Sequence, residues 1–206
     1  MDALAELIQA LRLLPSVGPK SAQRMAYALL SHRERGMHLS RCLEKAMVNI
    51  KHCQRCNNHT SHTHCDLCLN PQRKQHMLCI VEHPADVAAI EQSHAYEGLY
   101  YVLMGRISPL EGIGPDGIGL EQLKQRIQSE PIQELIFALS PTVEGQTTIY
   151  FIQDLLRGLP IHTSQLAHGI PSGGELEFLD ANTIGHAFRN RGKFIAHQHD
   201  EPCESA

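Results

Sequence analysis

The first 50 residues carry the hydrophobic spacing of short amphipathic helices. In the first stretch, apolar side chains recur every three or four positions, which places them on one face of a helix. These positions are Leu4, Leu7, Ile8, Leu11 and Leu14. Pro and Gly interrupt the pattern in residues 14–20, and Pro19 suits the first turn of a second helix. A third helix is expected from Leu39 to about Ile50.

From residue 77 the pattern changes to short apolar runs that alternate with helical segments. The predicted strands are residues 78–81, 99–104, 135–139 and 161–166, and the predicted helices are residues 85–92, 120–129 and 148–156. This alternation predicts a mostly parallel sheet with helices on both faces. A last helix is expected to be capped by Asp180 or Asn182 and to end near Arg189, and residues from about His197 are expected to be disordered.

Between these regions lie two C-x-x-C motifs separated by eight residues. Their cysteines are Cys53, Cys56, Cys65 and Cys68. Two facing thiolate pairs match the tetrahedral coordination of a structural Zn²⁺ ion, which leaves no open position for a substrate. His59, His62 or His64 could replace one thiolate, although loop positions in solvent suit them better. Few apolar residues surround the motifs, so this part is not expected to fold without its ion.

The charge is distributed unevenly along the chain. The net charge is −4, yet residues 1–76 hold 11 Lys and Arg against 5 Asp and Glu, whereas residues 77–206 hold 7 against 17. Such asymmetry indicates a basic face that meets a polyanion, although small domains also vary in charge by chance. Residues 1–14 lack the pattern of a signal peptide, and no apolar run is long enough to span a membrane. A cytoplasmic location is expected, where C-x-x-C pairs indicate metal or redox chemistry rather than disulfides.

The Gly/Pro turn near residue 18 has the features of a helix-hairpin-helix module. Gly18 lets backbone N–H groups approach a phosphate, the start of the following helix favours an anion, and Lys20 and Arg24 add positive charge. Such contacts position DNA without reading its bases. A simple corner between two helices is the alternative. A P-loop does not fit, because Pro19 precedes the lysine and no strand precedes the turn.

Two carboxylates are predicted near the carboxyl ends of strands, where α/β folds place their sites. Glu82 follows the first strand and Glu144 follows the third. Together they could hold Mg²⁺, although such carboxylates more often cap helices or face solvent. Residues 112–117 match G-x-G-x-x-G, but they follow no strand and contain Pro115, so a long ordered loop is expected there.

Several stretches, taken together, resemble the RecR family of bacterial recombination mediators. They are Leu14–Arg24, the four cysteines, Val81–Asp86, Leu110–Asp116, Pro141–Gly145 and His168–Glu177, and the resemblance covers all but the last few residues. It implies a multidomain α/β protein with a helix-hairpin-helix domain at residues 1–52, a four-cysteine zinc finger at 53–76 and a Toprim domain at 77–170. Residues 171–206 would form a C-terminal segment with a Walker-B-like stretch, a helix and a flexible tail.

The resemblance also implies a function and partners. Proteins of this family bind single- and double-stranded DNA, assemble from dimers into a tetrameric ring, and act with RecO and RecF to load RecA on single-stranded DNA. By resemblance, Lys20 and Arg24 contact DNA and the four cysteines hold one structural Zn²⁺ per chain. Neither a membrane nor a small-molecule substrate is implied. Two other functions stay open: a Mg²⁺-dependent nicking or primase-like enzyme using Glu82 and Glu144, and a protein-interaction adaptor.

Three positions depart from the family pattern. Ser16 replaces the first hairpin glycine, which stiffens the turn if that position needs a positive φ. Ser140 replaces an asparagine, and Gln146 replaces a glutamate, which removes an acidic group from the Toprim face. Catalytic Toprim enzymes hold Mg²⁺ with a glutamate and an Asp-x-Asp pair, whereas this chain has Ser-Pro-Thr at residues 140–142. A non-enzymatic role is therefore predicted, with Glu82 and Glu144 forming a partner surface or a weak Mg²⁺ site.

Overall fold

The computed structural model describes residues 2–167, 169–171 and 173–191. The tail that was predicted to be disordered lies outside these residues, as do His168 and Ser172 of the C-terminal motif. The chain divides into two compact units. One comprises Met1–Cys53 and His59–Cys65, and the other comprises Gln54–Asn58 and Asp66–Ala206. The division runs through the cysteine motifs.

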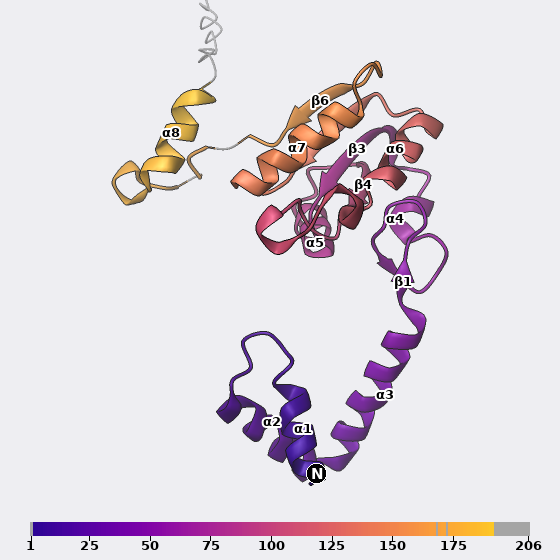
Figure 1. The fold of residues 1–206 in the computed structure, drawn as a ribbon, viewed down its shortest axis with the longest axis vertical. Helices are drawn as coiled ribbons and strands as arrows, with labels where there is room; N and C mark the ends of the chain where they lie inside the picture. Colours follow the sequence, from indigo (N-terminus) through magenta and orange to yellow (C-terminus); the bar gives the residue numbers. More distant parts are fainter. Residues whose placement is uncertain (1, 168, 172, 192–206) are drawn as a thin grey trace, which may run out of the picture. The chain divides into compact units, whose positions relative to one another are not determined.

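The first unit contains helices followed by a β-hairpin (Figure 1). Its elements are α1 (Ala3–Leu11), α2 (Pro19–Ser31), α3 (Arg33–Asn49), β1 (Lys51–His52) and β2 (His59–Thr60). Helix α1 packs against α2, and the Asp2 side chain caps α1 by accepting a hydrogen bond from the Leu4 N–H at 3.4 Å. Helix α3 begins six residues before the predicted start at Leu39. Its first turns are Arg-Glu-Arg-Gly-Met-His, which carry little apolar periodicity but include strong helix formers.

The helices of the first unit bury few side chains. Among the described residues of α1, α2 and α3, only Ala22 and Ala26 are fully buried. Large apolar side chains on α2 and α3 remain exposed, and these are Met25, Tyr27, Leu30, Met37, Leu39, Leu43, Met47 and Val48. This unit therefore carries apolar surface that its own residues do not cover.

The second unit is built on a four-stranded parallel sheet with the order β4–β3–β5–β6. The strands are β3 (Lys74–Val81), β4 (Gly98–Val102), β5 (Glu134–Ala138) and β6 (His162–Gln165). The helices beside them are α4 (Asp66–Leu69), α5 (Pro84–Ser93), α6 (Leu120–Ser129) and α7 (Val143–Leu155). The prediction of a parallel α/β sheet is confirmed.

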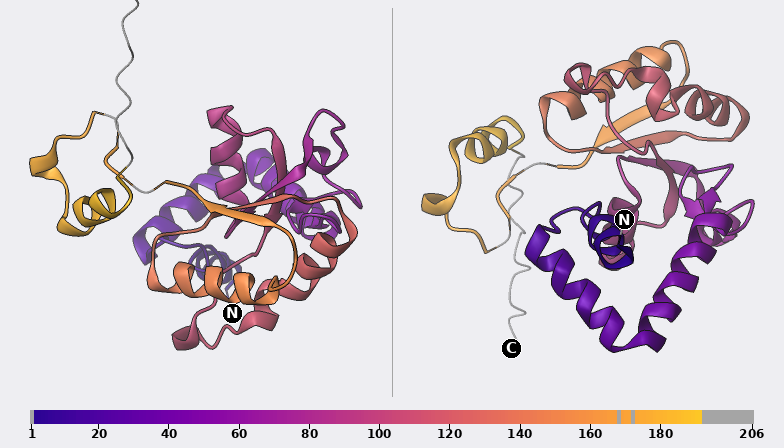
Figure 2. Two further views of the ribbon diagram at one scale, coloured as in Figure 1. Left: turned by 90° about the horizontal axis from the view of Figure 1, so that it is seen from above. Right: turned by 60° about the horizontal axis from the view of Figure 1, so that its bottom comes forward.

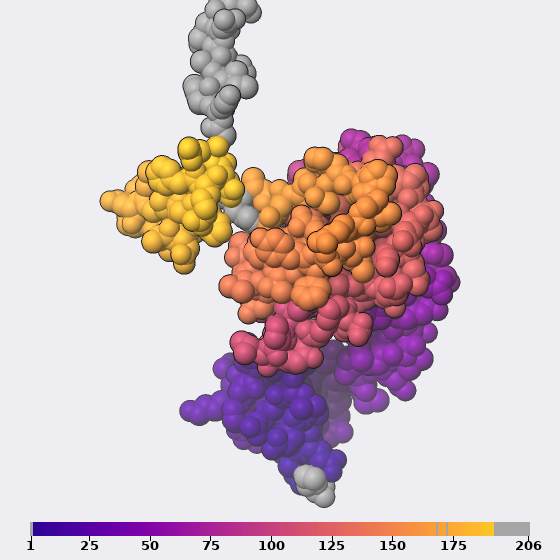
Figure 3. Space-filling model, turned by 45° about the horizontal axis from the view of Figure 1, so that its top comes forward, coloured from indigo at the N-terminus to yellow at the C-terminus, as the bar shows by residue number. Residues whose placement is uncertain are grey.

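Alternating side chains of the strands fill a core on each face of the sheet. Leu78 and Ile80 of β3 belong to the larger cluster, which α6 and α7 complete, and Cys79 and Val81 belong to the smaller cluster beside α5. Helices therefore cover both faces, as predicted (Figure 2). In the space-filling view, α7 and β6 form one continuous surface, drawn in orange (Figure 3).

Two element boundaries differ from the prediction in ways that matter for the site. Strand β3 begins at Lys74 rather than residue 78, with an irregular register between Lys74 and Leu78. Helix α7 begins at Val143 rather than residue 148, because the Thr142 hydroxyl caps it by accepting from the Gly145 N–H at 3.2 Å. Glu144 therefore lies in the first turn of a helix and not in a loop.

The remaining elements are short. The loop at residues 112–117 is ordered, as predicted; the 3-10 helix η1 (Pro109–Glu111) precedes it, and its second half forms part of the 3-10 helix η2 (Pro115–Ile118). The C-terminal segment contains η3 (Leu176–Phe178) and α8 (Ala181–Arg189). Asp180 caps α8, as predicted, by accepting from the N–H groups of Asn182 and Thr183 at 2.9 and 3.0 Å. Within the described ranges, no helix is long and apolar enough to cross a membrane.

Candidate functional site

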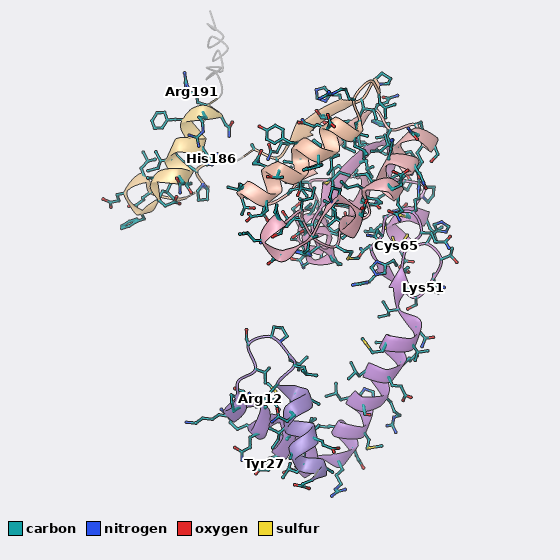
Figure 4. All side chains as sticks on the ribbon, viewed as in Figure 1. Arg12, Tyr27, Lys51, Cys65, His186 and Arg191 are labelled. Carbon is teal, nitrogen blue, oxygen red and sulfur yellow. The ribbon has the colours of Figure 1, made fainter. Side chains whose placement is uncertain are left out.

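The four predicted metal ligands come together. The sulfur atoms of Cys53, Cys56, Cys65 and Cys68 all lie within 4.8 Å of one another, and all four residues are buried. A tetrahedral Zn²⁺ with bonds of about 2.3 Å separates its sulfur ligands by about 3.8 Å, so the cluster needs little contraction. The Cys65 N–H also donates to the Cys53 sulfur at 3.3 Å. The four cysteines are thus positioned to hold a metal ion, and Cys65 is labelled in Figure 4.

Two other described cysteines stand apart from this cluster. Cys42 lies exposed on α3, and its sulfur is 3.5 Å from His38 Nε2. Cys79 packs in the core, where burial raises the pKa of its thiol to about 12. At that pKa the thiol stays protonated at neutral pH, so Cys79 is a packing residue. Cys203 lies outside the described residues.

The first C-x-x-C turn is hydrogen-bonded to the edge of the sheet. The Val102 N–H in β4 donates to the Cys56 carbonyl at 2.9 Å, and the Asn57 side chain donates to the Val102 carbonyl at 2.7 Å. Asn57 has a φ of 62°, a left-handed conformation that asparagine tolerates better than most residues. Cys56 and Asn57 therefore hydrogen-bond to the N–H and the carbonyl of Val102 in the edge strand.

A second attachment is an ion-pair network around Glu130, the residue that follows α6. Arg55, which lies between the first two cysteines, donates to both Glu130 oxygens at 2.8 and 3.0 Å. Arg126 donates to Glu130 at 3.2 Å and, through Nη1, to the carbonyls of Arg55 and Tyr100 at 2.9 and 2.7 Å. Burial acts to raise the pKa of Glu130, but the Arg55 hydrogen bond and the two positive charges outweigh it and lower that pKa. We call Arg55, Arg126 and Glu130 the anchor triad.

The anchor triad was missed in the reading of the sequence. Arg55 and Glu130 are separated by 75 residues, so no local spacing connects them. The only local signal is the pair Arg126 and Glu130 at i and i+4 in the last turn of a predicted helix, which is common on exposed helix faces. Burial distinguishes this pair, since the Arg126 side chain is only 5% exposed.

The hairpin between α1 and α2 has the backbone that Gly/Pro turns favour. Ser16 has a φ of 64°, so the position does require the left-handed region that its glycine counterpart would adopt freely. Gly18 is the N-cap of α2 in an extended conformation, and Pro19 follows as the first helical residue. The turn is closed by a hydrogen bond from the Val17 N–H to the Leu14 carbonyl at 3.2 Å.

The two predicted basic residues of this hairpin lie one helical turn apart on α2. Lys20 and Arg24 are both exposed, and the i, i+4 spacing places them on one face. No ion pair within the described part of the chain involves either residue. Figure 4 shows the side chains of these helices, with Arg12 and Tyr27 labelled. The arrangement leaves two positive charges available at the start of α2.

The predicted acidic residues lie at the carboxyl edge of the sheet. Glu82 follows β3 and is 3% exposed, and its two oxygens accept from the N–H and the hydroxyl of Ser140 at 2.8 and 3.1 Å. Glu144 lies partly exposed in the first turn of α7. Its own backbone N–H, the Thr142 hydroxyl and the positive Arg106 lower the pKa of its carboxyl.

Arg106 lies beside Glu82, a contact that the sequence pattern did not predict. Its Nη1 is 4.0 Å from the Glu82 oxygen Oε2, and its charge also acts on Glu144. The residues at this edge do not fit the Mg²⁺ of catalytic Toprim proteins. Glu82 already accepts hydrogen bonds from Ser140, and the positively charged Arg106 lies beside it. Residues 140–142 are Ser-Pro-Thr, where catalytic Toprim proteins have an Asp-x-Asp pair.

Comparisons with known proteins agree with the fold and its parts. A Toprim domain model matches residues 76–167, the RecR helix-hairpin-helix model matches residues 4–47, and the RecR C-terminal model matches residues 169–191. Recombination protein RecR of Legionella pneumophila strain Philadelphia 1 is 64% identical over 192 residues, which cover 93% of this chain and 96% of that protein. The protein of the same name from strain Corby is 64% identical and is covered over 98% of its length. The resemblance found in the sequence is confirmed, and the chain belongs to the RecR family of recombination proteins.

Proposed function

We propose that the chain is a DNA-binding recombination mediator without catalytic activity. The observation that carries the proposal is the hairpin before α2, where Gly18 begins a helix and Lys20 and Arg24 lie exposed on its first turns. A helix start presents unpaired N–H groups and a partial positive charge, which suit a phosphate. Contacts of this kind hold the DNA backbone regardless of base sequence.

The surroundings of Gly18 support the approach of a ligand. A Cβ atom at this position would meet no protein atom within 4 Å, and its φ of −79° is open to every residue. Neither packing nor backbone conformation within the chain therefore requires a glycine here. A phosphate that contacts the backbone would require one, because a side chain would occupy its place.

We propose Zn²⁺ as the metal, one ion per chain, in a structural role. Four thiolates are a donor set that Zn²⁺ favours over Mg²⁺ or Ca²⁺, and they would fill its coordination sphere. Four buried sulfur atoms this close together would repel one another as thiolates, so a cation stabilises the cluster. The ion would hold the two C-x-x-C motifs together.

Assembly into a ring of dimers that form a tetramer would overcome the acidic balance of residues 77–206. One chain presents few phosphate contacts, whereas several hairpins around a ring multiply them by raising the effective concentration. The exposed apolar side chains of α2 and α3 are compatible with such association. We propose domains at residues 1–52, 53–76, 77–170 and 171–206, in the order inferred from the sequence.

The partners proposed for the chain are single- and double-stranded DNA, RecO and RecF, with RecA as the recombinase that is loaded. In this role the protein acts in the cytoplasm and associates with the nucleoid when bound to DNA. The acidic edge of the sheet, with Glu82 and Glu144, is proposed as a partner surface. It does not act as a catalytic centre in this proposal, since its residues do not fit Mg²⁺.

The mediator role is tested by following RecA assembly on single-stranded DNA that is coated with its binding protein, in the presence of RecO. The wild type should shorten the lag before RecA filaments form. A Gly18→Ser variant should lose most of this effect while unfolding at the wild-type temperature, because serine is a favourable N-cap and meets no neighbouring atom. If Gly18→Ser shortens the lag as the wild type does, the hairpin is not the DNA contact.

The rival enzymatic function is tested separately. Supercoiled plasmid incubated with the protein and Mg²⁺ or Mn²⁺ should remain intact. Nicking that disappears in Glu82→Gln would establish a Toprim nuclease and overturn the non-catalytic assignment. Absence of any DNA binding at low salt, with RecO binding retained, would instead favour a pure protein-interaction adaptor.

A further inference from the structure

Hydrogen bonds of its two chain neighbours fix the backbone at Arg106 relative to Glu82 and to the turn that carries Glu144. The Gly105 N–H donates to the Glu82 carbonyl at 3.1 Å. The Ile107 N–H donates at 3.0 Å to the Thr148 hydroxyl, which in turn donates to the Glu144 carbonyl at 2.8 Å. The residue before Arg106 is thus tied to Glu82, and the residue after it is tied to the turn that carries Glu144.

The backbone of this turn is specialised. Met104 has a φ of 60° and Gly105 has a φ of 157°, so the chain leaves β4 through a conformation that most residues avoid. Thr148, which receives the Ile107 hydrogen bond, is completely buried. Because both sides of the turn are hydrogen-bonded to the elements that carry the carboxylates, the backbone position of Arg106 is determined by the fold.

Arg106 neutralises part of the negative charge at this edge without an added ion. Glu82 is almost completely buried, and the ion pair it makes in the described part of the chain is with Arg106, whose side chain is 38% exposed. The same guanidinium contributes to lowering the pKa of the Glu144 carboxyl. A buried carboxylate requires a partner of opposite charge, and here the protein supplies it.

We propose that Arg106 is a built-in counter-cation that takes the electrostatic role of Mg²⁺ at the carboxyl edge of this Toprim-type sheet and excludes divalent cations from Glu82 and Glu144. A divalent ion bound to these carboxylates would place two further positive charges within a few ångströms of the guanidinium. At about 4 Å, even one pair of like charges near a protein surface repels by several kcal/mol. Mg²⁺ also needs oxygen ligands in octahedral geometry, and Ser140 already occupies both Glu82 oxygens.

The exclusion is tested by titrating the zinc-loaded protein with Mn²⁺, a paramagnetic substitute for Mg²⁺, and measuring free Mn²⁺ by electron paramagnetic resonance. The wild type should not bind Mn²⁺ saturably. Arg106→Gln should bind it saturably, with a dissociation constant at least about tenfold below the highest Mn²⁺ concentration at which the wild type shows no binding, because a repulsion well above 1.4 kcal/mol has been removed. Arg106→Lys keeps the charge and should behave like the wild type. Adding Glu144→Gln to Arg106→Gln should abolish the new binding.

Two outcomes would overturn the proposal. Saturable Mn²⁺ binding by the wild type that Glu144→Gln abolishes would show that Arg106 does not exclude the ion. Equal lack of binding by the wild type, Arg106→Gln and a second neutral variant, Arg106→Ser, would show that something other than this charge keeps the ion out. Circular dichroism of each variant confirms that it is folded before titration. The result does not depend on DNA binding, so a failure of the mediator proposal would leave it unaffected.

Discussion

Replacing Glu130 with glutamine is predicted to weaken the attachment of the first C-x-x-C turn to the sheet. Glutamine has nearly the same shape but no charge, so the guanidiniums of Arg55 and Arg126 would face each other without their shared partner. Arg126 cannot turn to water, because its side chain is only 5% exposed. Its Nη2 atom already has no hydrogen-bond partner among the described residues, so the loss of Glu130 leaves a buried cation poorly compensated.

The expected loss of stability in Glu130→Gln follows from how deeply the ion pair is buried. Removing one partner of a fully buried ion pair costs about 3–5 kcal/mol. The Arg55 and Glu130 side chains keep 23% and 18% of their surface exposed, so solvent reduces this cost, and we expect a loss of about 2–3 kcal/mol in the free energy of unfolding. The matched control is Glu97→Gln, whose partner Lys74 is 51% exposed and lies 2.9 Å away. An exposed pair of this kind is screened by solvent and contributes little to stability.

The assay is urea unfolding of the zinc-loaded wild type and the two variants, at neutral and acidic pH. The pKa of Glu130 is lowered in the folded state, so its stabilising effect is present above the unfolded pKa of about 4.3 and is lost as the pH falls through the folded value. The stability difference between the wild type and Glu130→Gln should therefore shrink on acidification. If Glu130→Gln loses no more stability than Glu97→Gln at neutral pH, the anchor triad is not what holds the turn.

Three further perturbations follow from the same geometry. Ser16→Gly should raise the free energy of unfolding by about 0.5–1 kcal/mol, because glycine adopts a φ of 64° without strain but loses more chain entropy, and an unchanged melting temperature would contradict this. Gly145→Ala should cost about 1–3 kcal/mol, because its Cβ would overlap the Ser140 carbonyl oxygen, whereas Gly117→Ala meets only Ile113 at 3.4 Å and should be tolerated. Removing the metal with a mercurial and a chelator should release one Zn²⁺ per chain and disrupt the β1–β2 hairpin, and retention of native circular dichroism and oligomeric state would count against a structural ion.

The sequence predicted the parts of the fold that depend on local patterns. Apolar runs identified the parallel strands, and the spacing of the four cysteines identified the metal cluster, because a tetrahedral ion dictates that spacing. The start of α7 was missed because residues 143–147 carry no apolar periodicity, and the Thr142 cap decides the boundary instead. Glu144 therefore lies in the first turn of α7, whereas the predicted helix began four residues after it.

Long-range partners could not be predicted in this way. Arg55 and Glu130 meet across 75 residues, and Arg106 meets Glu82 across the end of a neighbouring strand, so neither contact leaves a periodic signal. The Ser16 departure shows the opposite case. The sequence alone indicated that serine would stiffen the turn if this position needs a positive φ, and the φ of 64° shows that it does.

The central claim is that the hairpin of Gly18, Lys20 and Arg24 holds the DNA backbone, and the salt dependence of DNA binding tests it most directly. Affinity for a duplex should be measured by fluorescence anisotropy at several salt concentrations for the wild type, Lys20→Ala and Arg24→Ala. The control is Arg157→Ala, which removes an exposed positive charge just after α7. Each lost phosphate contact should lower the slope of log affinity against log salt by about 0.9, equally for unrelated DNA sequences. The control should keep the wild-type slope. Wild-type affinity and slope in both Lys20→Ala and Arg24→Ala would contradict the account.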